Sequence, residues 1–204
     1  MTRFVLPIVA VLGVSWLAGL VSAQEGAGND EIKYKLQVDG KSPFVVANFV
    51  AGHHEGKPGC PYVMVSNSRK RGVVILGRGE EGVAQAIEIA KALEEKNLKA
   101  DQHLGFVVAY DVGHVMVAAL AKEAGLQHFG VGVPRGGNQS GEKLFQVLGI
   151  TDKTDTVVTV VDRKIVKGIW LLSNQNETKD SRAIVAGEAE KMILTEPEQP
   201  KANE

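Results

Sequence analysis

The sequence is poor in cysteine, and this scarcity excludes two kinds of chemistry. Among its 204 residues there is a single cysteine, Cys60. One thiol cannot form an intramolecular disulfide, so the stability of the fold must come from the packing of apolar side chains. One thiol also cannot supply the pair that an intramolecular dithiol–disulfide exchange needs.

The sequence also has almost no excess of charge of either sign. The chain has 23 Lys and Arg against 24 Asp and Glu, for a formal net charge of -1. A nucleic-acid-binding protein needs a strongly basic face, so we expect no nucleic acid among the partners. The sequence has no Gly-x-Ser-x-Gly segment either, which leaves Ser-His-Asp catalysis without support.

Only one long hydrophobic run occurs, and it lies at the N-terminus. The run covers Phe4 to Val21, follows Arg3 and ends in small residues at Ala23. This pattern predicts a signal peptide over residues 1–23 and an exported protein, periplasmic or secreted. A retained membrane anchor is the alternative, because the run is nearly long enough to cross a bilayer. We expect no membrane span after signal removal.

The rest of the sequence alternates between strand-like and helix-like segments. A flexible leader is expected at 24–30 and a disordered tail at 196–204. Strands are predicted at 32–38, 44–50, 62–65, 73–76, 106–110, 129–133, 156–161 and 164–172, and helices at 80–96, 112–124, 142–148 and 182–194. The first two strands would form an N-terminal hairpin, and the alternation after them predicts a largely parallel sheet with an antiparallel late pair.

The glycine-rich junction at 71–82 (RGVVILGRGEEG) is the centre of this pattern. Its Gly77, Gly79 and Gly82 match the spacing of a dinucleotide-binding fingerprint after a strand. Two carboxylates, Glu80 and Glu81, stand where a pyrophosphate would have to approach the helix start. We therefore interpret the segment as a turn and expect no nucleotide cofactor.

Several segments carry a pattern known from one superfamily. Residues 148–150 (LGI) and 156–166 (TVVTVVDRKIV) resemble the "YGV … TTFVIDRDGKIV" stretch of thioredoxin-like proteins of the peroxiredoxin type, and 130–134 (GVGVP) resembles the strand before it. Residues 60–64 (CPYVM), followed by VVILGRG, resemble exported thioredoxin-fold proteins of planctomycetes. The resemblance implies a three-layer α/β/α domain over 31–195, with a central mixed sheet and an N-terminal β-hairpin extension.

The same resemblance marks what this chain lacks. Working thioredoxins carry a Cys-x-x-Cys pair at the start of the helix after the central strand, and the matching positions here are Gly79 to Gly82. The family's cis-proline falls near Asp155 or Thr156. The leading hypothesis is therefore a non-catalytic binding or structural module with a degenerate redox site and an unknown protein or small-molecule partner.

Two alternatives use Cys60. In the first, Cys60 is the catalytic thiol of a one-cysteine, peroxidase-like oxidoreductase, which needs a nearby cation to stabilise the thiolate. In the second, His53, His54, Cys60 and Met64 bind copper or zinc, since copper-delivery members of this fold use Cys-x-x-x-Cys with a distant histidine. Met64 occupies the second position of that spacing. The metal hypothesis requires Cys60 and the histidines to converge in space.

Overall fold

The computed structural model describes residues 35–67, 71–96, 104–135, 141–150, 153–173 and 179–194. The predicted signal peptide at 1–23, the leader at 24–30 and the tail at 196–204 lie outside these ranges. Within the described part, no helix combines the length and the apolar character that crossing a membrane requires.

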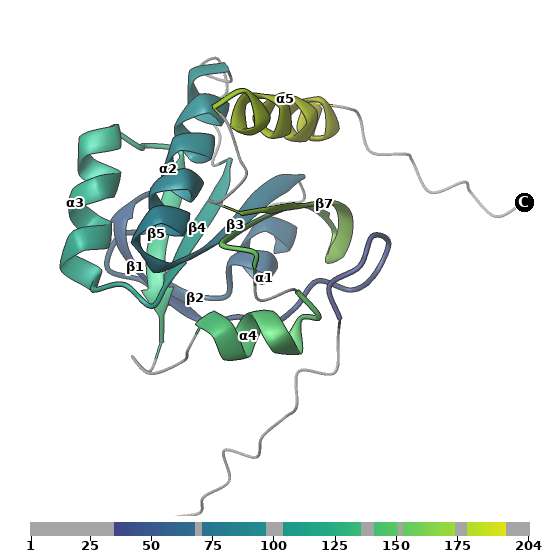
Figure 1. Ribbon diagram of the computed structural model, residues 1–204, viewed down its shortest axis with the longest axis horizontal. Coiled ribbons are helices and arrows are strands. Elements are labelled where there is room, and N and C mark those ends of the chain that lie inside the picture. Colours follow the sequence, from purple (N-terminus) through teal and green to yellow (C-terminus); the bar gives the residue numbers. More distant parts are fainter. Residues whose placement is uncertain are drawn as a thin grey trace, which may run out of the picture. The chain divides into compact units, whose positions relative to one another are not determined.

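Strands and helices alternate along the described residues (Figure 1). Their order is β1 (Ala47–Gly52), β2 (Pro58–Gly59), α1 (Pro61–Asn67), β3 (Gly72–Arg78), α2 (Gly79–Lys96), β4 (Gly105–Tyr110), α3 (His114–Ala124), β5 (Phe129–Pro134), α4 (Gly141–Val147), β6 (Thr156–Asp162), β7 (Ile165–Leu172) and α5 (Lys179–Leu194). The predicted helix at 80–96 and the predicted strands at 73–76 and 106–110 are confirmed as parts of α2, β3 and β4.

One mixed sheet joins all of these strands, in the order β2-β1-β5-β4-β3-β6-β7. Strands β3, β4 and β5 run parallel, whereas β6 pairs antiparallel with β3 and β7 pairs antiparallel with β6. The predicted mixed sheet is therefore confirmed, with the late antiparallel pair at one edge.

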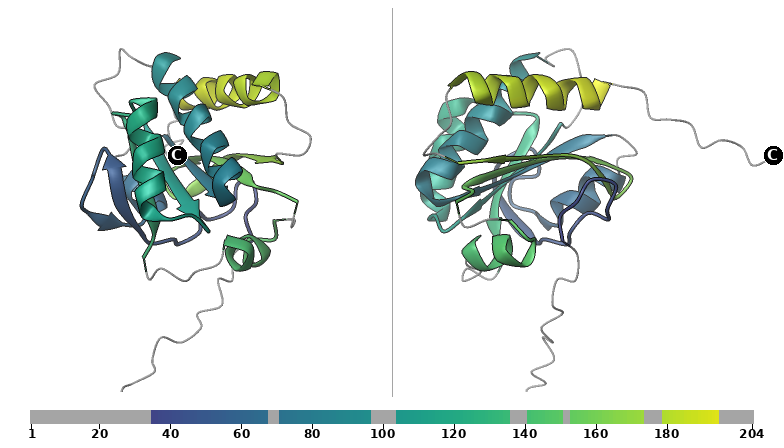
Figure 2. Two further views of the ribbon diagram at one scale, coloured as in Figure 1. Left: turned by 60° about the vertical axis from the view of Figure 1, so that its left-hand side comes forward. Right: turned by 45° about the vertical axis from the view of Figure 1, so that its right-hand side comes forward.

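The sheet is covered on both faces, because successive side chains of its central strands point to opposite sides. In β3, Val73 and Ile75 enter the cluster beneath α2, α3 and α5, whereas Val74 and Leu76 enter the cluster beside α1 and α4. All four side chains are fully buried. Figures 1 and 2 show the two groups of helices on opposite faces, so the predicted three-layer α/β/α architecture is confirmed.

The strand predicted at 62–65 is wrong, because these residues belong to helix α1. Pro61 is the first residue of the helix, a position where its missing N–H costs nothing. Tyr62 and Val65 are buried at helical spacing, and the Ser66 hydroxyl donates a hydrogen bond to the Tyr62 carbonyl at 2.7 Å. The apolar run is too short for the spacing of its apolar residues to distinguish a strand from a helix.

The N-terminal hairpin exists, but its arms differ from those predicted. Strand β1 pairs antiparallel with β2, not with residues 35–38 of the segment predicted at 32–38. Of that segment, residues 35–38 have no strand structure, and 32–34 lie outside the described ranges. The Leu36 N–H instead donates to the Leu148 carbonyl at 2.9 Å, and the Asp39 N–H donates to the Val166 carbonyl of β7 at 2.7 Å.

A buried carboxylate fixes the loop between α3 and β5. Glu94, near the end of α2, is only 7% exposed. Its oxygens accept hydrogen bonds from the backbone N–H groups of Gln127, His128 and Phe129 at 2.7 to 3.1 Å. Gln127 and His128 precede β5, and Phe129 is its first residue, so Glu94 supplies acceptors for the backbone N–H groups at the start of this strand.

Glu94→Gln should destabilise the fold, because one acceptor oxygen becomes an NH₂ donor that faces backbone donors. We expect the free energy of unfolding to fall by roughly 2–3 kcal/mol in urea denaturation. The matched control is Glu95→Gln at the exposed neighbouring position. This change should alter the free energy of unfolding by less than about 0.5 kcal/mol. Equal losses in the two variants would contradict the role assigned to Glu94.

Candidate functional site

The turn from β3 into α2 is packed against the segment that enters β6. A Cβ atom on Gly82 would lie 2.5 Å from the Asp155 carbonyl oxygen, and one on Gly77 would lie 2.8 Å from the Gly82 oxygen. Gly79 has a positive φ of 68°, a region that favours glycine. The Thr156 hydroxyl donates to the Gly82 carbonyl at 2.9 Å. Close packing and backbone geometry therefore explain the three glycines without a ligand.

Arg78, the last residue of β3, connects this turn to the segment that enters β6. Its backbone N–H donates to the Asp155 carbonyl at 2.8 Å, and its guanidinium lies 3.6 Å from the Asp155 carboxylate. The guanidinium carbon is 5.4 Å from the centre of the Phe145 ring, a cation–π distance. Glu80 and Glu81 are exposed at the start of α2. The junction between β3 and α2 therefore exposes two carboxylates, and its arginine is paired with Asp155.

Cys60 is buried and lies immediately before α1. It is 7% exposed and belongs to the apolar cluster between the sheet and helices α1 and α4. Tyr62 and Tyr110 share this cluster, and burial raises the pKa of both phenols, so both stay neutral near pH 7. The Met64 sulfur packs over Gly59, close to Cys60 in the chain. Cys60 thus sits among apolar and neutral side chains.

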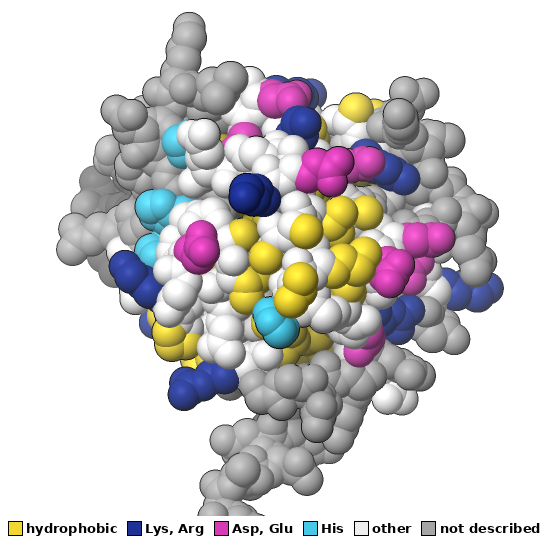
Figure 3. All heavy atoms as spheres, turned by 90° about the vertical axis from the view of Figure 1, so that its left-hand side faces the viewer, with side chains coloured by type: hydrophobic (Ala, Val, Ile, Leu, Met, Phe, Trp, Pro, Cys, Tyr) yellow, Lys and Arg dark blue, Asp and Glu magenta, His cyan; other side chains and the backbone are white. Residues whose placement is uncertain are grey.

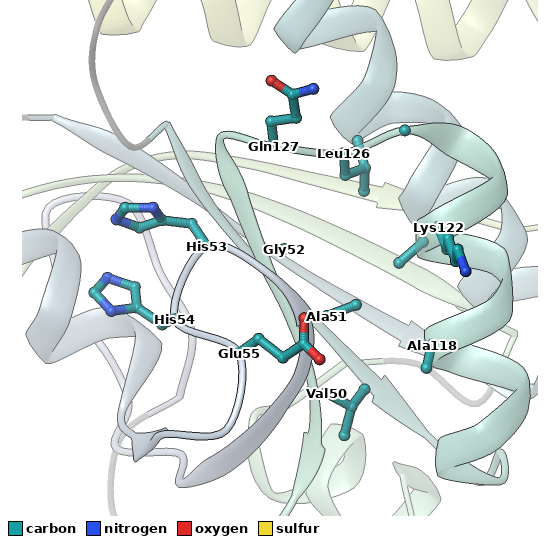
Figure 4. Close-up of a pocket in the computed structure, with 12 residues that line it drawn as sticks. Val50, Ala51, Gly52, His53, His54, Glu55, Ala118, Lys122, Leu126 and Gln127 are labelled. Atoms are coloured by element: carbon teal, nitrogen blue, oxygen red, sulfur yellow. The ribbon is translucent and has the colours of Figure 1, made fainter.

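His53 and His54 lie on the turn between β1 and β2. Their ring centres are 4.3 Å apart, and the His54 ring stacks on Phe106 with 5.7 Å between centres. Burial lowers the pKa of His54 below its usual 6.5, and charge repulsion from His53 and Lys57 lowers it further. Figure 4 shows the two imidazoles side by side on one side of the turn.

An open pocket of about 750 Å³ lies between this turn and α3 (Figure 4). Its wall at the turn is held by the His53 N–H, which donates to the Phe129 carbonyl at 3.0 Å. Small and aliphatic side chains make its floor, and two opposite charges, Glu55 and Lys122, stand at its rim. Its lining comes from segments about 60 residues apart in the chain, so no local sequence pattern could have indicated it. The only hint in the sequence is the set of alanines along α3.

The structure brings the candidate residues together as two pairs. His53 contacts His54, whereas Cys60 and Met64 lie around the first turn of α1. Within the described ranges, no group of three or more His, Cys, Asp or Glu residues is placed to hold one metal ion. Both the copper or zinc site and the catalytic role of Cys60 stay predictions.

The protonation of His54 should depend on its neighbour His53, which NMR can follow from the C–H resonances of the His54 imidazole. We expect a midpoint below 6.5 for His54, and a higher midpoint in His53→Gln, because one repulsive charge is removed. Since the folded pKa lies below the unfolded one, the contribution of His54 to stability is present above pH 6.5 and is lost as the pH falls through the folded pKa. An unchanged midpoint in His53→Gln would contradict the coupling.

Comparison with known proteins supports the fold. No protein-family model matches the sequence, and no curated protein matches it. Among solved structures, a peroxiredoxin-like protein from Aquifex aeolicus superposes with a TM-score of 0.50 at 14% identity, covering 78% of this chain and 90% of that one. The thioredoxin domain of a thiol-disulfide oxidoreductase from Bacteroides vulgatus has a TM-score of 0.47 at 10% identity, covering 78% and 99%. The chain therefore has a thioredoxin-like fold.

Proposed function

We propose that this chain is an exported thioredoxin-fold protein that binds a partner and performs no thiol chemistry. The observation that carries the proposal is the placement of the one thiol in the described residues. Cys60 is 7% exposed in an apolar cluster, whereas the start of α2 carries Gly79, Glu80, Glu81 and Gly82. The position that a redox enzyme of this fold uses for its thiols is therefore occupied by carboxylates.

Electrostatics at the start of α2 supports the same conclusion. A helix N-terminus favours a thiolate through its unpaired N–H groups and its dipole. Glu80 and Glu81 place two negative charges at this N-terminus, and like charges disfavour a second anion nearby. The acidic side chains therefore stabilise the helix and make the junction a poor place for an oxidoreductase nucleophile.

The pocket between the β1–β2 turn and α3 is where we expect a ligand to bind. It combines an apolar floor with a few polar groups at the rim, which is the composition of ligand sites in general. Glu55 and Lys122 offer one charge of each sign, and Gln127 offers an amide. A small zwitterionic molecule or a peptide segment has the matching chemistry.

The reactivity of Cys60 towards an uncharged thiol reagent tests the absence of thiol chemistry. Because its sulfur is shielded, modification of the native protein requires local opening and should be slow. The matched control is the double variant Cys60→Ser/Glu81→Cys, which places the one thiol at the exposed start of α2. We expect the wild type to react at least about 100-fold more slowly than this variant, and at a comparable rate in denaturant.

A fast native reaction at Cys60, with a thiol pKa well below 8.5, would instead favour the peroxidase-like alternative. The metal alternative is tested on the same samples by titration with Cu(I) and Zn(II). It requires that Cys60→Ser and at least one of His53→Gln and His54→Gln weaken binding. Equal binding by the wild type and all three variants would exclude a shared site.

Export is tested by the mass of the protein recovered from cells. We expect the periplasmic or secreted form to begin at Gln24, because the signal-like segment ends in small residues at Ala23. Ala23→Arg should slow cleavage and leave the larger form. Recovery of uncleaved protein in the membrane fraction would favour the retained anchor.

A further inference from the structure

Helix α3 lacks the charged face that a surface helix usually turns towards water. Its sequence is HVMVAALAKEA, and no Lys, Arg, Asp or Glu occurs from His114 to Ala121. A helix with one side in water normally carries charged and polar residues on that side. Val115 is instead 71% exposed, and Figure 3 shows hydrophobic side chains gathered over α3. Exposed apolar patches of this kind mark interaction surfaces.

One stripe of this surface leads into the pocket beside the β1–β2 turn. Val115, Ala118, Ala119 and Lys122 follow the spacing i, i+3, i+4, i+7, so they lie along one side of the helix. Ala118 and Lys122 line the pocket, whereas Val115 and Ala119 are exposed and continue the stripe beyond it. At 1.5 Å per residue the stripe is about 10 Å long. The pocket is therefore one end of a longer apolar surface.

Strand β1 supplies the wall of the pocket that faces α3. Ala47 and Phe49 enter the cluster on the α1 and α4 side of the sheet. Side chains alternate along a strand, so Asn48 and Val50 face the side on which α3 lies. Val50 packs against the cluster of that side and lines the pocket. The floor between β1 and α3 is therefore aliphatic on both sides.

Two charges of opposite sign stand at the pocket end of this surface. Figure 4 shows Glu55 of the turn and Lys122 of α3 on opposite sides of Ala51. No ion pair between described residues includes either of them. Successive side chains of an extended peptide point in opposite directions. A basic residue followed by an acidic one therefore complements the two walls.

We propose that the pocket and the α3 stripe together bind an extended peptide segment of a partner protein, in which a neighbouring basic and acidic pair adjoins alternating aliphatic residues. The basic residue faces Glu55, the acidic residue faces Lys122, and the aliphatic side chains cover Ala118 and Val115. An extended segment advances about 3.3 Å per residue, so three or four residues span the stripe. This inference rests on the pocket of the proposed function. It selects a peptide over a small zwitterion, because a zwitterion confined to the pocket would leave Val115 in water.

NMR titration of the ¹⁵N-labelled protein with two peptides tests the inference. The probes are acetylated and amidated Lys-Glu-Leu-Ser-Leu-Ser-Leu and its reverse, Leu-Ser-Leu-Ser-Leu-Glu-Lys, which cover both chain directions. One of them should shift the amide resonances of Val115, Ala119 and Lys122. Val115→Lys should raise its Kd at least about fivefold, because an ammonium replaces an aliphatic contact. The control is Ile184→Lys on α5, a position 60% exposed, which should leave the Kd unchanged.

Reversal of one charge tests the orientation of the peptide in the pocket. Lys122→Glu should weaken binding of the better probe, and replacing the glutamate of that probe by lysine should restore it. Circular dichroism establishes that each variant is folded. Equal binding of the probe by wild type, Val115→Lys and Lys122→Glu would overturn the inference.

Free leucine, a small zwitterion, separates this inference from the proposed function. Shifts of the pocket amides with leucine, and none over α3 with either peptide, would overturn the peptide inference and leave the pocket as a ligand site. Absence of shifts with all three probes would overturn the inference and remove the pocket from the proposed function as well. Peptide-induced shifts at Val115 and Ala119 that leucine does not produce are the expected result.

Discussion

The burial of β3 on both faces is the constraint on which the rest of the structure depends. Its side chains from Val73 to Leu76 are completely shielded, and its backbone pairs with β4 on one side and with β6 on the other. A strand in this position must be apolar on both faces, which is why VVIL is a continuous run without alternation. The helices of both layers are placed by their contacts with this strand and its neighbours.

The same constraint determines what the C-terminal end of β3 can present. Gly77 and Gly82 allow the start of α2 to lie against Asp155, and a larger residue at either position would meet backbone atoms. Arg78 is held by Asp155 and by the Phe145 ring. In redox enzymes of this fold, the junction between this strand and the helix that follows it carries thiols. In this chain the same junction is tightly packed and carries acidic side chains. A concave surface in the described part of the chain lies beside His53 and His54.

The sequence was sufficient to predict the layers, the sheet type and most element bounds, because these follow from long periodic segments such as α2 and from the buried runs of β3 and β4. It was insufficient for α1, where a short apolar segment after Pro61 fits a strand and a helix equally. It also gave no sign that Asp39 and Gly40 pair with Val166, since that contact joins segments more than a hundred residues apart. The pocket depends on such long-range packing too.

Peroxide consumption by the purified protein under excess reductant tests the central claim most directly. In this account Cys60 is a shielded core residue, so the wild type and Cys60→Ser should both consume peroxide at the rate of the reductant alone. Turnover by the wild type that disappears in Cys60→Ser would contradict the account and would identify the chain as a one-cysteine enzyme.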